Sequence, residues 1–310
     1  MPHRAARRRP PRIGFSGRQN HVGSLMGIII AGQENSTPIE LHYEDHGSGD
    51  PVVLLAGWPL DSRSWEPQIH ALLGAGHRVI AYDRRGFGRS SRPTEGYDFD
   101  TLAGDLHRLL TELDLREVTL IGFSLGTGEL ARYIGTHGTG RLQACVFIES
   151  LAPSFAKSDH NPEGVDQAGV AEVQQAILDD RFAWLTGLVQ NLLNLDDYLG
   201  KRVSEETARA IWDAAADASP WATWACPPGW LEDFSDDITK IDIPVLILHG
   251  TADRVLPVNG QGRRLHAAMP AARYVEIDGG PHVMGVTHAA EVNRELLAFL
   301  CDTARTSATA

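Results

Sequence analysis

Cysteine is scarce in this 310-residue sequence, and its placement excludes two classes of protein. The chain has three cysteines, Cys145, Cys226 and Cys301, and no pair of them has the C-x-x-C spacing of a metal or redox site. A disulfide scaffold is therefore excluded. The sparse, odd-numbered set favours a reducing, cytoplasmic location, and we expect no structural metal.

Long apolar runs are also missing. The longest, such as residues 245–248, fall far short of the ~20 residues that a membrane span needs, so we expect no membrane partner. Hydrophobic residues make up 43% of the chain and charged residues 22%, as in an ordinary soluble globule. The length fits one large domain or two small ones.

Positive charge is in deficit overall. The formal charge is −12, which argues against nucleic acid as a partner. Residues 1–25 are the exception, because they hold six arginines and no acidic residue, and the rest of the chain holds the other 22 basic and all 40 acidic residues. The apolar stretch that follows is too short for a signal peptide. We interpret 1–25 as a disordered basic extension, with Met26 as an alternative start and a nucleic-acid or membrane tail as the competing interpretation.

The apolar pattern predicts alternating strands and helices. A hairpin is expected from residues 27–31 and 39–45, and further strands at 51–56, 78–83, 117–123, 144–150, 245–249 and 273–278. Helices are expected after Asp98, at 125–137, near 262–269 and at 288–301. Such alternation predicts an α/β fold, a mostly parallel sheet with helices on both faces.

Residues 153–237 interrupt this alternation with helical periodicity and no clear strand. We interpret them as a helical lid inserted in a core formed by 26–152 and 238–303, with 304–310 as a tail. An insertion at the carboxyl edge of a parallel sheet lies over the crevice where such sheets bind ligands. Most tryptophans of this segment should join lid to sheet, and one or two could line an apolar pocket. The five tryptophans are Trp184, Trp212, Trp221, Trp224 and Trp230.

The strongest chemical signal is Gly122-Phe123-Ser124-Leu125-Gly126, the chain's one G-x-S-x-G pattern. The pattern alone is weak, but here a strand leads into it and a helix leads out. A serine on such a tight turn exposes its hydroxyl above the sheet edge as a nucleophile. The alternative is a serine that only caps the helix.

A serine nucleophile needs a base, and the base needs an orienting acid, in the chain order Ser, Asp or Glu, His. His282 follows the strand at 273–278 in the loop Gly279-Gly280-Pro281, and Asp253 follows the strand at 245–249. Both lie at the same sheet edge as Ser124. Asp278 and Glu149 are the rival acids, whereas His249 and His288 are interpreted as structural.

An oxyanion hole requires two backbone N–H groups near the serine. Leu125 supplies one at the start of the helix, where the partial positive charge favours an anion. Trp58 should supply the other, in the loop Ala56-Gly57-Trp58-Pro59, because Gly57 lets that backbone turn towards the serine.

Several segments together resemble one family: Trp58-Pro59-Leu60-Asp61, Tyr82 to Ser90, Val118 to Ser124 and Ala131-Arg132-Tyr133. The sequence is similar to the cofactor-free (non-haem) haloperoxidases, arylesterases and perhydrolases, which have the α/β-hydrolase fold. The resemblance implies that Ser124, Asp253 and His282 are a catalytic triad with Trp58 and Leu125 as oxyanion donors. It also implies hydrolysis of small esters, formation of peracids with peroxide, and no need for a metal, haem or other cofactor. Asp83, Arg84 and Arg85 match the family too, and we assign them a structural role.

The match has departures. Ala56-Gly57 replaces the family's usual His-Gly, Leu125 replaces a frequent Met, and Thr127 interrupts a glycine run. The pocket and the substrate are therefore expected to differ from those of other members. A lactone, amide or carbon–carbon bond hydrolase and a non-catalytic ligand-binding protein are the competing functions. A small ester-like molecule is the expected partner, and a homo-oligomer is left open.

Overall fold

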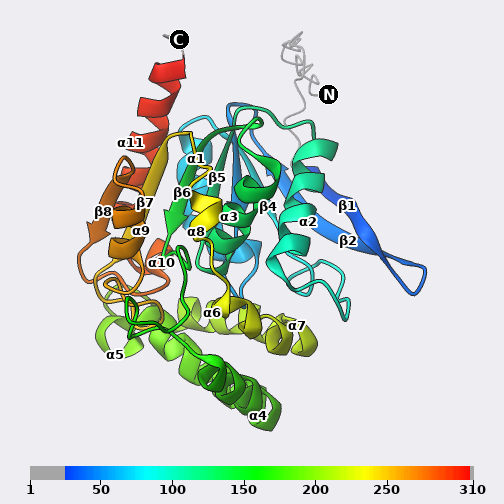
Figure 1. Cartoon of the computed structure of the whole chain (residues 1–310), viewed down its shortest axis with the longest axis vertical. Helices are drawn as coiled ribbons and strands as arrows, with labels where there is room; N and C mark the ends of the chain where they lie inside the picture. Colours follow the sequence, from blue (N-terminus) through cyan, green and yellow to red (C-terminus); the bar gives the residue numbers. More distant parts are fainter. Residues whose placement is uncertain (1–24, 308–310) are drawn as a thin grey trace, which may run out of the picture.

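The fold is a single eight-stranded sheet covered by helices, seen in a computed structural model that describes residues 25–307 (Figure 1). All of the expected basic extension except Leu25 lies outside the described residues, as do residues 308–310 of the expected tail. The strands are β1 (Leu25–Glu34), β2 (Thr37–His46), β3 (Pro51–Leu55), β4 (Arg78–Tyr82), β5 (Val118–Phe123), β6 (Leu142–Ile148), β7 (Val245–Gly250) and β8 (Arg273–Ile277).

The sheet has the order β1-β2-β4-β3-β5-β6-β7-β8. β1 and β2 form an antiparallel hairpin, and β2 pairs antiparallel with β4. From β4 to β8 all neighbours are parallel. The mostly parallel α/β-hydrolase sheet expected from the sequence is therefore confirmed.

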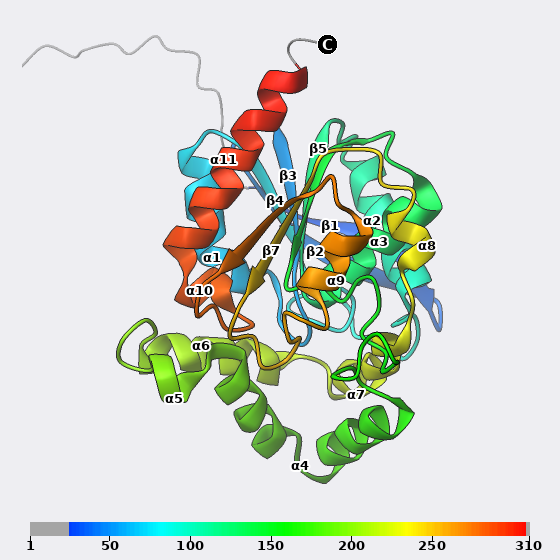
Figure 2. The same ribbon diagram turned by 60° about the vertical axis from the view of Figure 1, so that its left-hand side comes forward.

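Helices cover both faces of the sheet, because its central strands are apolar on both sides. In β3, Val52 and Leu54 pack in the same cluster as α1 and α11, whereas Val53 and Leu55 pack with α2 and α3. Full burial of each such side chain contributes roughly 1.5–3 kcal/mol. The two layers are visible in Figure 2. The helices of the layers are α1 (Glu66–Gly74), α10 (Met284–Thr287) and α11 (Ala289–Ser307), and α2 (Phe99–Glu112), α3 (Leu125–His137), α8 (Ser235–Ile238) and α9 (Gly262–Ala268).

Helix α2 shows how the sequence sets a boundary. Asp98 adopts an extended conformation just before it, and its side chain accepts a hydrogen bond of 2.8 Å from the Thr101 N–H. Such a cap satisfies an N–H that has no partner inside the helix. Leu102, Leu106 and Leu109 then lie on one face and are fully buried. The predicted start of this helix is therefore confirmed.

A group of helices between β6 and β7 gathers at one edge of the sheet (Figures 1 and 2). Its longest helix, α4, bends at Asp180, whose backbone is not helical and whose carboxylate caps the second half by accepting from Ala183 N–H at 3.0 Å. The members are α4 (Gln167–Leu193), α5 (Leu195–Tyr198), α6 (Glu205–Asp217), α7 (Pro220–Ala225) and the 3₁₀ helix η2 (Pro227–Leu231).

Four elements differ from the sequence expectations. Helix α1 and the 3₁₀ helix η1 (Ser62–Trp65) before it were not predicted, because α1 is short and its second residue is Pro67, which is typical of turns but is tolerated in the first turn of a helix. The hairpin turn is only Asn35 and Ser36. Helix α11 continues to Ser307, so part of the expected tail is helical. Among residues 25–307, no helix combines the length and apolar character that crossing a bilayer requires.

Candidate active site

Ser124 stands on a strained turn between β5 and α3. Its φ of 51° and ψ of −120° are unusual for a residue with a side chain, and its N–H is held by the Ile148 carbonyl at 2.9 Å. The flanking glycines are needed for space. A Cβ on Gly122 would lie 2.7 Å from the Gly126 carbonyl oxygen, and one on Gly126 would collide with the backbone of Leu55. The sequence pattern therefore produces this turn by backbone packing.

A chain of hydrogen bonds leads away from the Ser124 hydroxyl. His282 Nε2 lies 2.9 Å from Ser124 Oγ, and His282 Nδ1 lies 2.7 Å from Asp253 Oδ2. The other Asp253 oxygen accepts the N–H groups of Val255 and Leu256 at 2.7 and 2.9 Å. The structure thus brings His282 into contact with Ser124, 158 positions away in sequence, and with Asp253, 29 positions away.

The electrostatics of Asp253 favour a carboxylate at this place. Its burial acts to raise the pKa, but the charge and the hydrogen bond of His282 outweigh burial and lower the pKa of Asp253 below its usual range. An ionised acid beside Nδ1 holds the imidazole in the tautomer whose Nε2 can accept a proton.

Neither rival acid contacts His282. Asp278 is exposed and its carboxylate accepts a long hydrogen bond, 3.5 Å, from the Thr251 hydroxyl. Glu149 is fully buried, and one of its oxygens accepts the Gly250 N–H at 3.0 Å. Of the three candidate acids, Asp253 is the one placed against the imidazole.

The two expected oxyanion donors lie at the same cavity as the serine. Trp58 and Leu125 both line the cavity that contains Ser124 and His282. The backbone N–H groups of Trp58 and Leu125 donate no hydrogen bond to any of the described residues. Gly57 is required here because a Cβ on it would lie 2.7 Å from the Phe123 ring and 3.0 Å from Ser124 Cβ.

A buried ion pair lies behind this loop. Arg84 Nη2 donates to the Ala56 carbonyl at 2.9 Å and to Glu129 Oε2 at 2.6 Å, and Glu129 also bonds the Tyr82 hydroxyl. Arg85 makes a two-pronged pair with Asp105 at 2.7 Å. These arginines therefore hold the backbone, in keeping with the structural role expected of them.

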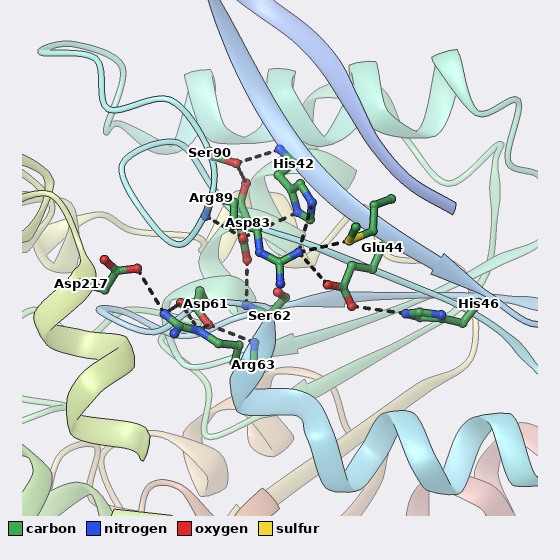
Figure 3. Close-up of polar contacts among 11 residues, drawn as sticks. His42, Glu44, His46, Asp61, Ser62, Arg63, Asp83, Arg89, Ser90 and Asp217 are labelled. Atoms are coloured by element: carbon green, nitrogen blue, oxygen red, sulfur yellow. Dashed lines mark hydrogen bonds and ion pairs between the residues drawn. The ribbon is translucent and has the colours of Figure 1, made fainter. Parts of the chain in front are cut away.

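Asp83 ties together the loops that follow β3 and β4, as Figure 3 shows. Its carboxylate accepts the N–H groups of Ser62 and Arg89 at 3.0 and 2.9 Å, and its carbonyl accepts the Ser90 hydroxyl. In the same view Arg63, held by Asp61, reaches Asp217 at the end of α6. The loop that carries Trp58 is thus anchored both to the sheet and to the helical insertion.

The cavity over Ser124 is small and apolar, with a volume of about 50 Å³. The insertion supplies part of its wall, because Trp230 lines the cavity and packs edge-on to Trp58 with ring centroids 5.1 Å apart. The ring of Trp184 also packs against Trp58, with centroids 5.5 Å apart. The lining residues are Trp58, Ser124, Leu125, Leu151, Phe155, Leu188, Leu192, Trp230, Val255, Leu256 and His282. A larger cavity of about 750 Å³ lies between α6 and α1, but none of Ser124, Asp253 and His282 lines it.

In the described part of the chain, one group of side chains is close enough to bind a metal ion. Glu149, His249 and Asp253 are all buried, with donor atoms within 4.8 Å of one another. Most of their donor atoms already have protein partners: His249 Nε2 lies 2.8 Å from the Leu256 carbonyl, Glu149 Oε1 accepts the Gly250 N–H at 3.0 Å, and Asp253 is engaged by three N–H groups. Among the described residues, Glu149 Oε2 and His249 Nδ1 have no hydrogen-bond partner. The arrangement fits a hydrogen-bonded cluster better than a metal site.

A serine on a strand-to-helix turn, bonded through a histidine to an aspartate at one sheet edge, is the arrangement typical of α/β-hydrolases. The chain belongs to this family, because the family model described as alpha/beta hydrolase fold matches residues 50–289.

Within this family, the chain is similar to non-heme haloperoxidases and to an esterase/perhydrolase. The chain is 48% identical over 275 residues to a putative non-heme chloroperoxidase of Synechocystis, covering 89% of this chain and 100% of that protein. It is 30% identical to a bifunctional esterase/perhydrolase of Acinetobacter calcoaceticus, covering 84% and 96%. The crystal structure of a bromoperoxidase from Bacillus anthracis superposes with a TM-score of 0.85 at 45% identity, covering 89% and 99%. The expected resemblance is therefore confirmed.

Sequence reasoning missed part of the pocket wall. Phe155, Leu188 and Leu192 come from the insertion. For Leu188 and Leu192 in α4, apolar helical spacing does not show which side faces the cavity, and Phe155 lies in the irregular segment before α4, where no periodicity applies. It also assigned no part to Glu149 beside Asp253. The position of Glu149 at the end of a strand next to β7 was the available signal.

Proposed function

We propose that this protein is a serine hydrolase that cleaves small carboxylic esters through an acyl-enzyme. The observation that carries the proposal is the unbroken series of hydrogen bonds from Ser124 through His282 to Asp253, next to two unused backbone N–H groups. Relatives named as an esterase/perhydrolase and as haloperoxidases support the same class of chemistry.

The geometry assigns the protons. An ionised Asp253 can only accept, so His282 Nδ1 carries the ring proton and Nε2 is free to accept from Ser124. Ser124 Oγ attacks the ester carbonyl as its proton moves to Nε2. The tetrahedral intermediate collapses when Nε2 returns this proton to the leaving alcohol. Water then repeats the sequence on the acyl group and frees Ser124.

The N–H groups of Trp58 and Leu125 stabilise the negative oxygen of each tetrahedral intermediate. Loss of one such donor typically costs ~3–4 kcal/mol of transition-state stabilisation. Because Arg84 holds the Ala56 carbonyl by a hydrogen bond, the Trp58 N–H is preorganised and needs no reorientation during the reaction.

The cavity supports a short acyl group. Its volume of about 50 Å³ and its aromatic and aliphatic lining leave room for a few heavy atoms and offer no charged partner apart from the relay itself. We assign residues 153–237 the role of a lid over the carboxyl edge of the core, since Leu188 and Trp230 close the cavity from above.

Peroxide can replace water in the second half-reaction. Hydrogen peroxide would donate its proton to His282 Nε2 and attack the acyl carbon, giving a peracid and free Ser124. The relative described as a bifunctional esterase/perhydrolase supports this side activity.

The test is Ser124→Ala, assayed with a short aryl ester and with a fluorophosphonate label. We expect hydrolysis, labelling and peracid formation all to fall to background, with an unchanged circular dichroism spectrum. Ser62→Ala is the matched control, since Ser62 lines the larger cavity away from His282, and it should keep all three. Undiminished turnover by Ser124→Ala would refute the proposal.

A further inference from the structure

Two buried side chains, Glu149 and His249, lie next to Asp253. Glu149 follows β6 and His249 lies near the end of β7, and both are completely buried. His249 Nε2 lies 3.0 Å from Glu149 Oε2 and 3.7 Å from Asp253 Oδ2. Two carboxyl groups and an imidazole therefore share one water-excluded space.

His249 is a neutral member of this cluster. The Leu256 carbonyl lies 2.8 Å from Nε2 and can only accept, so Nε2 carries the ring proton. Nδ1 has no partner among the described residues, and burial lowers the pKa of His249. The imidazole consequently supplies no positive charge that could balance two ionised carboxylates.

The two carboxyl groups are not equally supplied with donors. Asp253 accepts from Val255, Leu256 and His282, whereas Glu149 accepts only the Gly250 N–H on Oε1. Glu149 Oε2 accepts no hydrogen bond from any described residue. Burial, followed by the charge and the hydrogen bond of Asp253, raises the pKa of Glu149 well above its usual range. A proton shared by this pair therefore belongs on Glu149.

We propose that Glu149 is a positioning residue, whose protonated carboxyl donates a hydrogen bond to the Asp253 carboxylate and holds it against His282. This inference rests on the proposed serine-hydrolase function. Asp253 is then the single anion of the cluster. The titratable groups that face Glu149 are Asp253 and His249, with His282 beyond Asp253 and Glu276 beyond His249.

The proposal predicts different results for two variants in the pH profile of kcat/KM. Glu149→Gln keeps a donor for Asp253 and an acceptor for Gly250. Its acid limb should stay within ~0.2 pH unit of wild type, with a fall in kcat of less than about threefold. Glu149→Leu removes the donor, which leaves Asp253 a stronger partner for the His282 cation. We expect its acid limb to move up by about half a unit and kcat to fall about tenfold.

The matched control is Asp278→Asn, which removes an exposed carboxylate near His282 in sequence and should leave the acid limb in place. If Glu149 were instead ionised in the wild type, Glu149→Gln would shift the acid limb of the kcat/KM profile. Loss of that charge would lower the acid limb by about one unit or more. That result would overturn the proposal, as would identical profiles for the Gln and Leu variants. If Glu149→Leu does not fold, Glu149→Gln alone decides.

A second measurement does not depend on activity. A raised pKa means that folded Glu149 keeps a proton that the unfolded chain releases above about pH 4.3. The free energy of unfolding of the wild type therefore falls as the pH rises from about 4.3 to the raised pKa of folded Glu149. Glutamine does not titrate, so the Tm of Glu149→Gln minus that of wild type should increase from pH 5 to pH 8. Infrared difference spectra should also show a neutral carboxylic acid band that Glu149→Gln lacks. A Tm difference that shrinks with pH, or an absent band, would overturn the protonated state, whereas an inactive wild type would refute only the proposed function.

Discussion

Replacement of Asp253 by asparagine should disable the relay by reversing the direction of its hydrogen bonds. Asp253 Oδ1 accepts two backbone N–H groups, so an asparagine there keeps its carbonyl oxygen on Val255 and Leu256. Its NH₂ group then occupies the place of Oδ2, 2.7 Å from His282 Nδ1. Because NH₂ can only donate, Nδ1 must be bare and Nε2 must carry the proton.

The consequence is a histidine that faces Ser124 with a donor. Nε2 lies 2.9 Å from Ser124 Oγ and could no longer accept the hydroxyl proton. In serine hydrolases the wrong tautomer lowers kcat about 10⁴-fold, which corresponds to ~5.5 kcal/mol of barrier. KM should change little, because Asp253 is not among the residues that line the cavity.

The assay is steady-state hydrolysis of a short aryl ester at neutral pH, together with the rate of fluorophosphonate labelling. Asp253→Asn should lose both in parallel and retain its Tm within a few degrees. Asp278→Asn, the rival acid by sequence, should behave as wild type. A loss of less than tenfold in Asp253→Asn, or equal losses in the two variants, would show that Asp253 does not orient His282.

Three further predictions concern stability: two substitutions near the site and one comparison substitution in α2. Gly126→Ala puts a methyl group against the backbone of Leu55 and should reduce the free energy of unfolding by ~1–3 kcal/mol as well as kcat. Gly104→Ala, in α2 where nothing lies within 4 Å of the new atom, should instead stabilise by ~0.4–1 kcal/mol in urea titrations. Arg84→Met leaves Glu129 buried without its partner and should cost ~3–5 kcal/mol of stability by the same measurement. An Arg84→Met protein of wild-type stability would show that the ion pair with Glu129 is not needed.

The strands of the core and the closeness of Ser124, Asp253 and His282 could be predicted because both follow from local rules. Central strands such as β5 read as continuous apolar runs, and the placement of Ser124, Asp253 and His282 follows from the ends of parallel strands meeting at one edge. The choice of Asp253 over Glu149 and Asp278 depended on loop geometry, which spacing only suggested. The insertion could be predicted as helical, but the side of α4 that faces Ser124 depends on tertiary packing, so Leu188 and Leu192 were not found.

The departures from the family pattern act on the pocket and leave the relay intact. Thr127 interrupts the usual glycine run, and its hydroxyl donates to the Ser124 carbonyl at 2.5 Å while accepting the Leu151 N–H at 2.9 Å. Leu151 lines the cavity, so Thr127 connects one wall of the pocket directly to the turn that carries Ser124. The Ala56 carbonyl accepts a hydrogen bond from Arg84, so the backbone of the loop that carries Trp58 is held without the histidine that the family usually places there. The shape of the cavity over Ser124 is thus the feature in which this chain should differ most from its relatives, since both changes act on backbone placement around Ser124 and neither touches His282 or Asp253.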